Sequence, residues 1–205
     1  MKRVVGWTFL IFFGLVAVNY FLTLAGNFFA YGGWARADQS GAQLASIDFS
    51  MFDKNGAGRS YITQGYGRTS FAYAYVADWH NGIDIAAAYG APVYSPADGT
   101  VIATGNQDNY CPRRGFGRFV AIKDAGNGLV LWFAHLGKIN VSVNDAVKKN
   151  DLVATVGSSG FETGTHLHLS IFSADGFSMA PRNGCGPDAT GHDLNPLSYL
   201  GTTYQ

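Results

Sequence analysis

The sequence predicts a mainly β domain that follows one hydrophobic N-terminal helix. Residues 4–24 carry no charged side chain, whereas the chain beyond residue 60 consists of short apolar or alternating runs separated by turn residues. The 205 residues include 27 Gly and only 6 Pro, a composition that favours tight turns between short strands. Because 47% of the residues are hydrophobic, the chain can bury a core, which excludes the disordered class.

The charge balance argues against a nucleic-acid partner. Lys and Arg together number 14, as do Asp and Glu, so the formal net charge at pH 7 is zero. Without an excess of positive charge, a protein lacks the field that holds nucleic acid through counterion release. We therefore expect no nucleic-acid binding.

Residues 1–30 are expected to form a membrane anchor or an export signal. The uncharged run from Val4 to Leu24 is long enough to cross the hydrocarbon core, about 30 Å thick, as a helix. Lys2 and Arg3 precede it, which predicts a cytoplasmic N-terminus and an extracytoplasmic location for the rest. We favour an uncleaved anchor because the apolar region of a signal peptide usually spans roughly 7 to 15 residues. The alternatives are cleavage near Ala35-Arg36-Ala37, which would give a secreted protein, and a buried core helix.

Residues 31–60 are expected to be a linker and lead-in to the β domain. Their composition shifts to Gly, Ala, Ser, Asp and Gln, which bury little apolar surface, with one ordered patch expected at Ile47-Asp48-Phe49. The β domain is expected over residues 61–200, and residues 201–205 form a C-terminal tail.

Six runs within the β domain are predicted to be strands, because they are rich in β-branched and aromatic residues and are bounded by turn signals. They are Pro92–Tyr94, Gly99–Ala103, Phe119–Ile122, Leu129–Phe133, Leu152–Val156 and Leu167–Phe172. Gly126-Asn127-Gly128 lies between two of them and predicts a hairpin, since Asn and Gly tolerate positive φ. No repeat with a period of about 20 to 50 residues is present, which argues against solenoids and propellers.

Two cysteines, Cys111 and Cys185, stand among Pro, Gly and Asn and both follow the export segment. We expect an extracytoplasmic disulfide between them, with two unpaired thiols as the alternative. Neither has a second Cys or His at ligand spacing, so we do not expect a cysteine-based metal site.

Four of the five histidines lie beside turns or on short apolar runs. His80 and Asp84 can converge on one ion if the chain turns at Asn81-Gly82. A His and an Asp four positions apart also arise by chance, so this pair alone is weak support for a metal site.

His166 and His168 are the more informative pair. Positions i and i+2 of a strand share one face, so both imidazoles point into the same space while Leu167 and Leu169 face the other way. A merely polar strand face is the alternative for this pair. The Gly-rich run from Gly157 to Thr165 precedes it and predicts a loop that approaches a ligand closely.

His135 ends the hydrophobic run from Leu131, and taken alone it would be read as a hydrogen-bonded core histidine. Taken together, these clusters supply two His and one Asp as ligands, with two more His left over. That set is typical of a catalytic zinc site, in which three protein ligands leave the fourth position to water.

The order of these residues resembles that of the lysostaphin-type, LytM-like peptidoglycan zinc metallopeptidases. The resemblance extends to Ile62–Gly67, Gly90–Val101 and Leu194–Leu200, and it covers roughly Tyr61 to Leu200. It implies an antiparallel β-sheet or sandwich of the duplicated hybrid motif type, with a groove over the sheet. Two positions depart from the family pattern: Thr165 stands where Pro is frequent, and Ser170 where an acidic residue is common.

The resemblance also implies roles for the site residues. His80, Asp84 and His168 would bind zinc, and His135 and His166 would be the catalytic pair. The implied activity is that of a zinc metalloendopeptidase acting on stem peptides or cross-links of bacterial peptidoglycan, with a Gly-Gly bond and a D-amino-acid cross-link both open. Six aromatic residues are candidates for either the groove or the core: Tyr66, Phe71, Tyr73, Tyr75, Trp79 and Phe161.

Two other classes of function remain as alternatives. One is a non-catalytic relative that binds the cell wall and activates a separate hydrolase, and the other is a wall-binding module tethered to the membrane. All five site positions of the family pattern carry the expected His or Asp, which favours an enzyme over an activator or a wall-binding module. His192 has no partner at ligand spacing and is predicted to be a surface residue or a neighbour of the site. No coiled-coil heptads are present, so the sequence predicts no particular oligomeric state.

Overall fold

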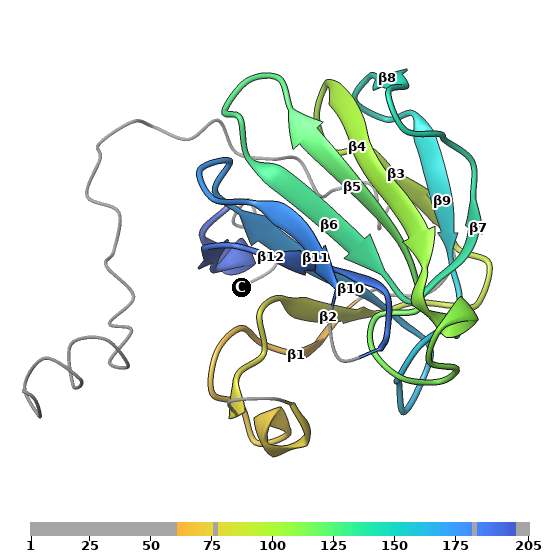
Figure 1. Cartoon of the computed structure of the whole chain (residues 1–205), viewed down its shortest axis with the longest axis vertical. Helices are drawn as coiled ribbons and strands as arrows, with labels where there is room; N and C mark the ends of the chain where they lie inside the picture. Colours follow the sequence, from red (N-terminus) through yellow and green to blue (C-terminus); the bar gives the residue numbers. More distant parts are fainter. Residues whose placement is uncertain (1–60, 76–77, 182–183, 200–205) are drawn as a thin grey trace, which may run out of the picture. The chain divides into compact units, whose positions relative to one another are not determined.

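The computed structural model describes residues 61–75, 78–181 and 184–199 (Figure 1). This part of the chain is mainly β, and all its strand pairs are antiparallel, as predicted. Its helices are 3₁₀ turns: η2 (Ala72–Ala74), η4 (Gln107–Asn109) and η5 (Pro196–Ser198). None of the helices described is long and apolar enough to traverse a bilayer. The predicted N-terminal helix, the patch at residues 47–49 and the C-terminal tail lie outside the described residues.

The largest element is an eight-stranded sheet with the order β1-β2-β10-β6-β5-β4-β8, in which β13 also pairs with β10. Strand β10 therefore lies between β2 and β6, although these come from distant parts of the sequence. The strands are β1 (Tyr61–Gln64), β2 (Ile83–Ala86), β4 (Gly99–Asn106), β5 (Arg118–Asp124), β6 (Val130–Ala134), β8 (Ala146–Val147), β10 (His166–Phe172) and β13 (Asp193–Leu194).

A three-stranded sheet covers one face of the large sheet. It has the order β3-β9-β7, formed by β3 (Pro92–Tyr94), β9 (Leu152–Val156) and β7 (Leu136–Ile139). One apolar cluster contains buried side chains of both sheets, including Phe133 and Leu167 from the large sheet and Val153 and Val156 from the small one. The two sheets thus form a sandwich around one core.

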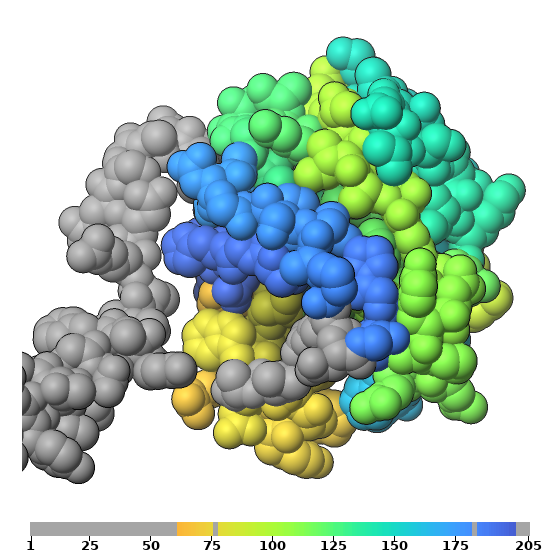
Figure 2. Space-filling model, in the orientation of Figure 1, coloured from red at the N-terminus to blue at the C-terminus, as the bar shows by residue number. Residues whose placement is uncertain are grey.

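The opposite face of the large sheet packs against a hairpin of β11 (Ser178–Pro181) and β12 (Pro187–Thr190). A second apolar cluster joins them, with Trp132 and Phe119 from the sheet, Met179 from β11 and Ala189 from β12. Near this hairpin, Cys111 and Cys185 form the predicted disulfide, with their Cα atoms 4.8 Å apart. Figure 2 shows β12, in dark blue, beside the lime-green segment that follows β4.

All six predicted strands are present, two of them with the predicted bounds. Several other strands were not predicted from the sequence, among them β2, where Asp84 was interpreted only as a possible ligand next to a turn. β2 is strand because it pairs on both sides, with β1 and with β10.

The hairpin at Gly126–Gly128 is present between β5 and β6, although its chemistry differs in part from the prediction. Gly128 has a φ of 68°, but Asn127 does not adopt positive φ. The Asp124 carboxylate instead accepts the N–H groups of Gly126 and Asn127, at 3.1 and 2.8 Å. A side-chain acceptor therefore stabilises this turn together with the glycine.

Candidate metal centre

The two histidines of β10 lie on the face of the large sheet that the hairpin covers. Leu167 and Leu169 are fully buried in the sandwich core, so His166 and His168 point the other way, as predicted from the alternation of the strand. His168 pairs in register with Asp84 of β2 on one side and with Ala134 of β6 on the other. This register places the Asp84 carboxylate directly beside the His168 ring.

His80, Asp84 and His168 form one buried cluster. Asp84 Oδ1 lies 2.9 Å from His168 Nδ1 and 3.3 Å from His80 Nε2, and these two nitrogens are 3.1 Å apart. All three candidate ligand atoms lie within 4.8 Å of one another, and each residue is at most 5% exposed. Two imidazole nitrogens and one carboxylate oxygen are a donor set that fits a transition-metal ion with an open position.

Hydrogen bonds on the far side of each ring orient the imidazoles. His80 Nδ1 lies 2.7 Å from the carbonyl oxygen of Gly65. Because a carbonyl only accepts, His80 Nδ1 carries the proton and Nε2 presents its lone pair to the cluster. His168 is turned the opposite way: its Nε2 lies 2.8 Å from Ser170 Oγ, which leaves Nδ1 facing Asp84.

His135 reaches the cluster through an unusual backbone conformation. Continuation of β6 would place its side chain on the core face with Leu131 and Phe133. Its φ of 58° instead turns the chain between β6 and β7, so that the ring lines the same cavity as His168. His135 is buried and hydrogen-bonded, but it is not the core histidine that the sequence alone suggests. Its Nδ1 donates to the carbonyl oxygen of Ser159 at 2.7 Å.

His166 lies next to both His135 and Asp84. Its ring centroid is 4.7 Å from that of His135, and its Nε2 is 3.5 Å from Asp84 Oδ1. Nδ1 donates to the carbonyl oxygen of Gly164 at 2.6 Å, which again leaves Nε2 with the lone pair. The structure thus brings all five predicted site residues together.

Burial keeps the His135 and His168 rings neutral. Burial, with added repulsion from His168 and His166, lowers the pKa of His135 to about 3. Burial likewise lowers the pKa of His168, against the opposing effect of Asp84. For Asp84 burial acts to raise the pKa, but the neighbouring His168 and His80 side chains outweigh it and hold the pKa well below the usual range. The site therefore combines a neutral His168 imidazole with an ionised Asp84 carboxylate, the states that metal binding requires.

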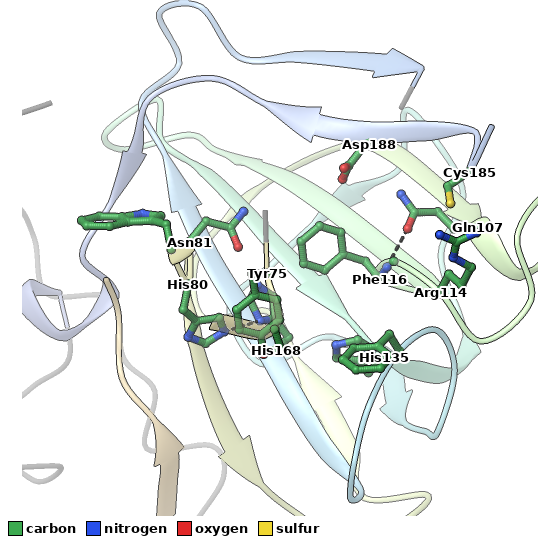
Figure 3. Close-up of a pocket in the computed structure, with 14 residues that line it drawn as sticks. Tyr75, His80, Asn81, Gln107, Arg114, Phe116, His135, His168, Cys185 and Asp188 are labelled. Carbon is green, nitrogen blue, oxygen red and sulfur yellow. Dashed lines mark hydrogen bonds between the residues drawn. The ribbon is translucent and has the colours of Figure 1, made fainter. Parts of the chain in front are cut away.

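Two cavities flank the cluster and together form a groove. The first, of about 570 Å³, is lined by His80, His135 and His168 (Figure 3). The second, of about 560 Å³, is lined by Asp84 and His166. Tyr75 and Phe161 line both, so the two cavities adjoin beside the cluster. The five residues accordingly lie between two halves of one groove.

The aromatic candidates divide between groove and core. Tyr75, Trp79 and Phe161 line the first cavity and Phe71 the second, whereas Tyr66 packs against the sandwich core and Tyr73 is exposed. Phe116 was not predicted, yet it lines the first cavity with its ring centroid 5.1 Å from that of His168. Its position between two glycines, in Gly115-Phe116-Gly117, was the available signal, because such a segment can approach other backbone closely.

Comparison with known proteins agrees with this geometry. The model of peptidase family M23 matches residues 78–181, half of the chain. The chain is 31% identical over 106 residues to the glycyl-glycine endopeptidase ALE-1 of Staphylococcus capitis, covering 52% of this chain and 28% of that protein. It is 36% identical over 92 residues to the peptidoglycan DD-endopeptidase ShyA of Vibrio cholerae, covering 45% of this chain and 20% of that protein. Less than a third of either relative is thus matched.

A solved structure supports the same assignment. The catalytic domain of the prophage-encoded M23 protein EnpA from Enterococcus faecalis, in a single-residue variant, superimposes with a TM-score of 0.51 at 29% identity. The superposition covers 69% of this chain and 92% of the EnpA chain. Sequence, fold and the arrangement of the His and Asp side chains thus lead to one assignment: the chain belongs to peptidase family M23.

Proposed function

We propose that this protein is a zinc metalloendopeptidase that hydrolyses stem peptides or peptide cross-links of bacterial peptidoglycan. The observation that carries the proposal is the convergence of His80 Nε2, Asp84 Oδ1 and His168 Nδ1 beside two further imidazoles in a groove. The relative ShyA, a peptidoglycan DD-endopeptidase, supports the substrate class, and the relative ALE-1, a glycyl-glycine endopeptidase, supports the type of reaction.

His80, Asp84 and His168 are the proposed metal ligands. Three protein ligands of this type suit a catalytic zinc ion, because they leave a coordination position for water or substrate. When bound there, zinc supplies Lewis acidity toward the scissile carbonyl and lowers the pKa of bound water to about 7.

His135 and His166 are the proposed catalytic pair. The carbonyl oxygens of Ser159 and Gly164 hold both Nδ1–H groups, so each Nε2 is free to exchange a proton within the groove. One imidazole can accept the proton of the attacking water and later protonate the leaving amine. The other imidazole, once its Nε2 is protonated, can donate a hydrogen bond to the developing oxyanion.

The proposed location is outside the cytoplasm. A peptidoglycan substrate requires it, and the disulfide between Cys111 and Cys185 is typical of an oxidising compartment. Attachment to the membrane through residues 1–30 remains a prediction from the sequence.

The test is amine release from purified peptidoglycan by the zinc-loaded chain, beside two variants. His168→Ala should lose both bound zinc and activity, whereas His135→Ala should keep zinc and lose turnover. Metal content, measured on the same samples, separates the two roles. Full turnover by His168→Ala would contradict the ligand assignment. No release by the zinc-loaded wild-type protein would favour an activator of a separate hydrolase.

A further inference from the structure

Arg114 is a positively charged side chain that lines the first cavity of the groove. The other lining residues are mostly aromatic rings, the candidate metal-centre residues and backbone. Figure 3 shows Arg114 beside Gln107 and Cys185, at the end of the cavity away from His80. Its guanidinium has no ion pair or hydrogen bond with any side chain in the part of the chain that the structure describes.

The neighbouring polar groups in this cavity are already engaged. The amide of Gln107 accepts the N–H of Phe116 at 2.6 Å and donates to the carbonyl oxygen of Pro187 at 2.8 Å. Asp188, the acidic side chain that lines the cavity, is 3% exposed and has an interaction of its own. Arg114 is therefore available to a ligand, whereas the Gln107 amide is occupied by the backbone groups of Phe116 and Pro187.

The backbone that carries Arg114 is held at several points. The disulfide at Cys111 ties the segment to residue 185, and the Arg114 N–H donates to the carbonyl oxygen of Cys111 at 3.1 Å. On the other side, the carbonyl oxygen of Gly115 accepts the N–H of Phe161 at 2.8 Å. The backbone at Arg114 is therefore fixed before a substrate arrives, which lowers the part of the entropic cost of binding that comes from ordering this segment.

We propose that Arg114 determines specificity by binding a free carboxylate of the peptide substrate. This inference rests on the proposed peptidase function and narrows its substrate class. A guanidinium forms paired, charge-assisted hydrogen bonds with a carboxylate, and Arg114 presents one from an exposed position at the end of the cavity. A glycine bridge has no side chain and would leave both the aromatic walls and Arg114 without a ligand. Stem peptides with acidic side chains or a free terminal carboxyl group supply what this cavity recognises.

The test compares substrates and two matched variants of the full chain. The substrates are a cross-linked stem-peptide dimer containing diaminopimelate with free carboxyl groups, the same dimer amidated at the side-chain or at the terminal carboxyl group, and pentaglycine. The variants are Arg114→Gln and Arg113→Gln. Arg113 is exposed like Arg114 but lines neither cavity, so its substitution controls for loss of surface charge.

Arg114→Gln should lower kcat/KM for the free-carboxylate dimer by roughly 10- to 100-fold, the usual range for a charge-assisted hydrogen bond. It should leave the rate unchanged for the dimer whose recognised carboxyl group is amidated, which identifies that group. Arg113→Gln should match the wild type. Equal effects of Arg114→Gln on free and amidated dimers, or hydrolysis of pentaglycine by the wild type as fast as that of the dimer, would overturn the inference.

Equilibrium binding separates this inference from the proposed function. Calorimetric titration of the free-carboxylate dimer should give a Kd weakened by a similar factor in Arg114→Gln, whether or not the dimer is hydrolysed. Binding that depends on Arg114 without hydrolysis would support the inference and contradict the peptidase. Hydrolysis of the dimer with the same Kd in the wild type and in Arg114→Gln would support the peptidase and contradict the inference about Arg114.

Discussion

His168 is held from two sides at once. Asp84 faces its Nδ1 and the buried hydroxyl of Ser170 faces its Nε2. In the sequence, Ser170 is notable only as a departure from the family pattern. The structure gives it a contact with a candidate ligand, where a hydrogen-bonding group fixes the ring orientation.

We predict that Ser170→Ala weakens zinc binding. Loss of the hydroxyl leaves His168 Nε2 without its partner in a buried site, so the ring no longer prefers the orientation that presents Nδ1. Loss of such a neighbour typically costs about 10- to 100-fold in metal affinity. Competition with a chromophoric chelator measures this, and Ser178→Ala, at an exposed position on β11, is the control. Unchanged affinity in Ser170→Ala would show that the hydroxyl does not orient the ring.

The neutral state of His135 predicts how the stability of the metal-free protein depends on pH. Burial holds its pKa at about 3 in the folded chain, against an ordinary value of 6.5. Between these values the unfolded chain binds more protons than the folded chain, so stability falls as pH decreases from about 6.5 toward 3. His168 and Asp84, whose pKa values are also lowered, act in the same direction.

Thermal unfolding of the metal-free protein across this pH range is the measurement. Tm should fall as the pH is lowered below about 6.5, and the fall should be shallower in His135→Gln, which removes one of the groups responsible. Identical pH profiles of the two proteins would contradict a buried, neutral His135.

At the level of elements, the site depends on the close approach of β10 to the segment that leads into β2. Gly82 lies at this approach. A Cβ atom there would be 2.8 Å from His168 Nε2 and would also collide with the carbonyl oxygen of Leu169. Since the second contact is with backbone, it cannot be relieved by rotation of a side chain.

We therefore predict that Gly82→Ala disturbs both fold and site. Overpacking of this kind costs about 1–3 kcal/mol of unfolding free energy, and the displaced His168 ring should also bind zinc more weakly. Gly126→Ala is a matched control, because a Cβ at Gly126 would meet its nearest neighbour at an ordinary 3.6 Å. Urea denaturation and chelator competition on both variants check the prediction. Equal stability of the two variants would argue against the close packing seen at Gly82.

At the level of the whole described chain, the disulfide joins two segments 74 positions apart in the sequence. Cys111 follows η4, and Cys185 lies in the connection between β11 and β12, where it lines the first cavity. The crosslink therefore ties the segment that carries Arg114 to the β11–β12 hairpin, which packs on the large sheet.

Replacing both cysteines by serine should lower the unfolding free energy by about 4 kcal/mol, because a closed loop of this length restricts the unfolded chain. Urea denaturation of the double variant measures the loss. A reductant should lower the unfolding free energy of the wild type by the same amount. It should leave the unfolding free energy of the double variant unchanged. Equal stability of wild type and double variant would show that the crosslink does not stabilise the fold.

Much of this architecture could be predicted from local patterns in the sequence. The alternation of His166, Leu167, His168 and Leu169 predicted which side chains face the core, because the side chains of a strand alternate wherever it lies in a sheet. The spacing of His80 and Asp84 around Asn81-Gly82 indicated that the two could converge if the chain turned there. The apolar runs predicted four strands of the large sheet and two of the small one. Each of these features depends on neighbours within a few positions.

The tertiary structure alone decided how those local pieces form a groove. His135 points into it because the chain turns with positive φ where β6 meets β7, against the face that strand alternation would assign. Ser170 contacts His168, and Arg114 and Phe116 line a cavity, through contacts with segments distant in sequence. Such contacts depend on which strands become neighbours and on how the chain closes over them. No periodicity within one segment contains that information, so the ligand types could be read from the sequence and the recognition surface could not.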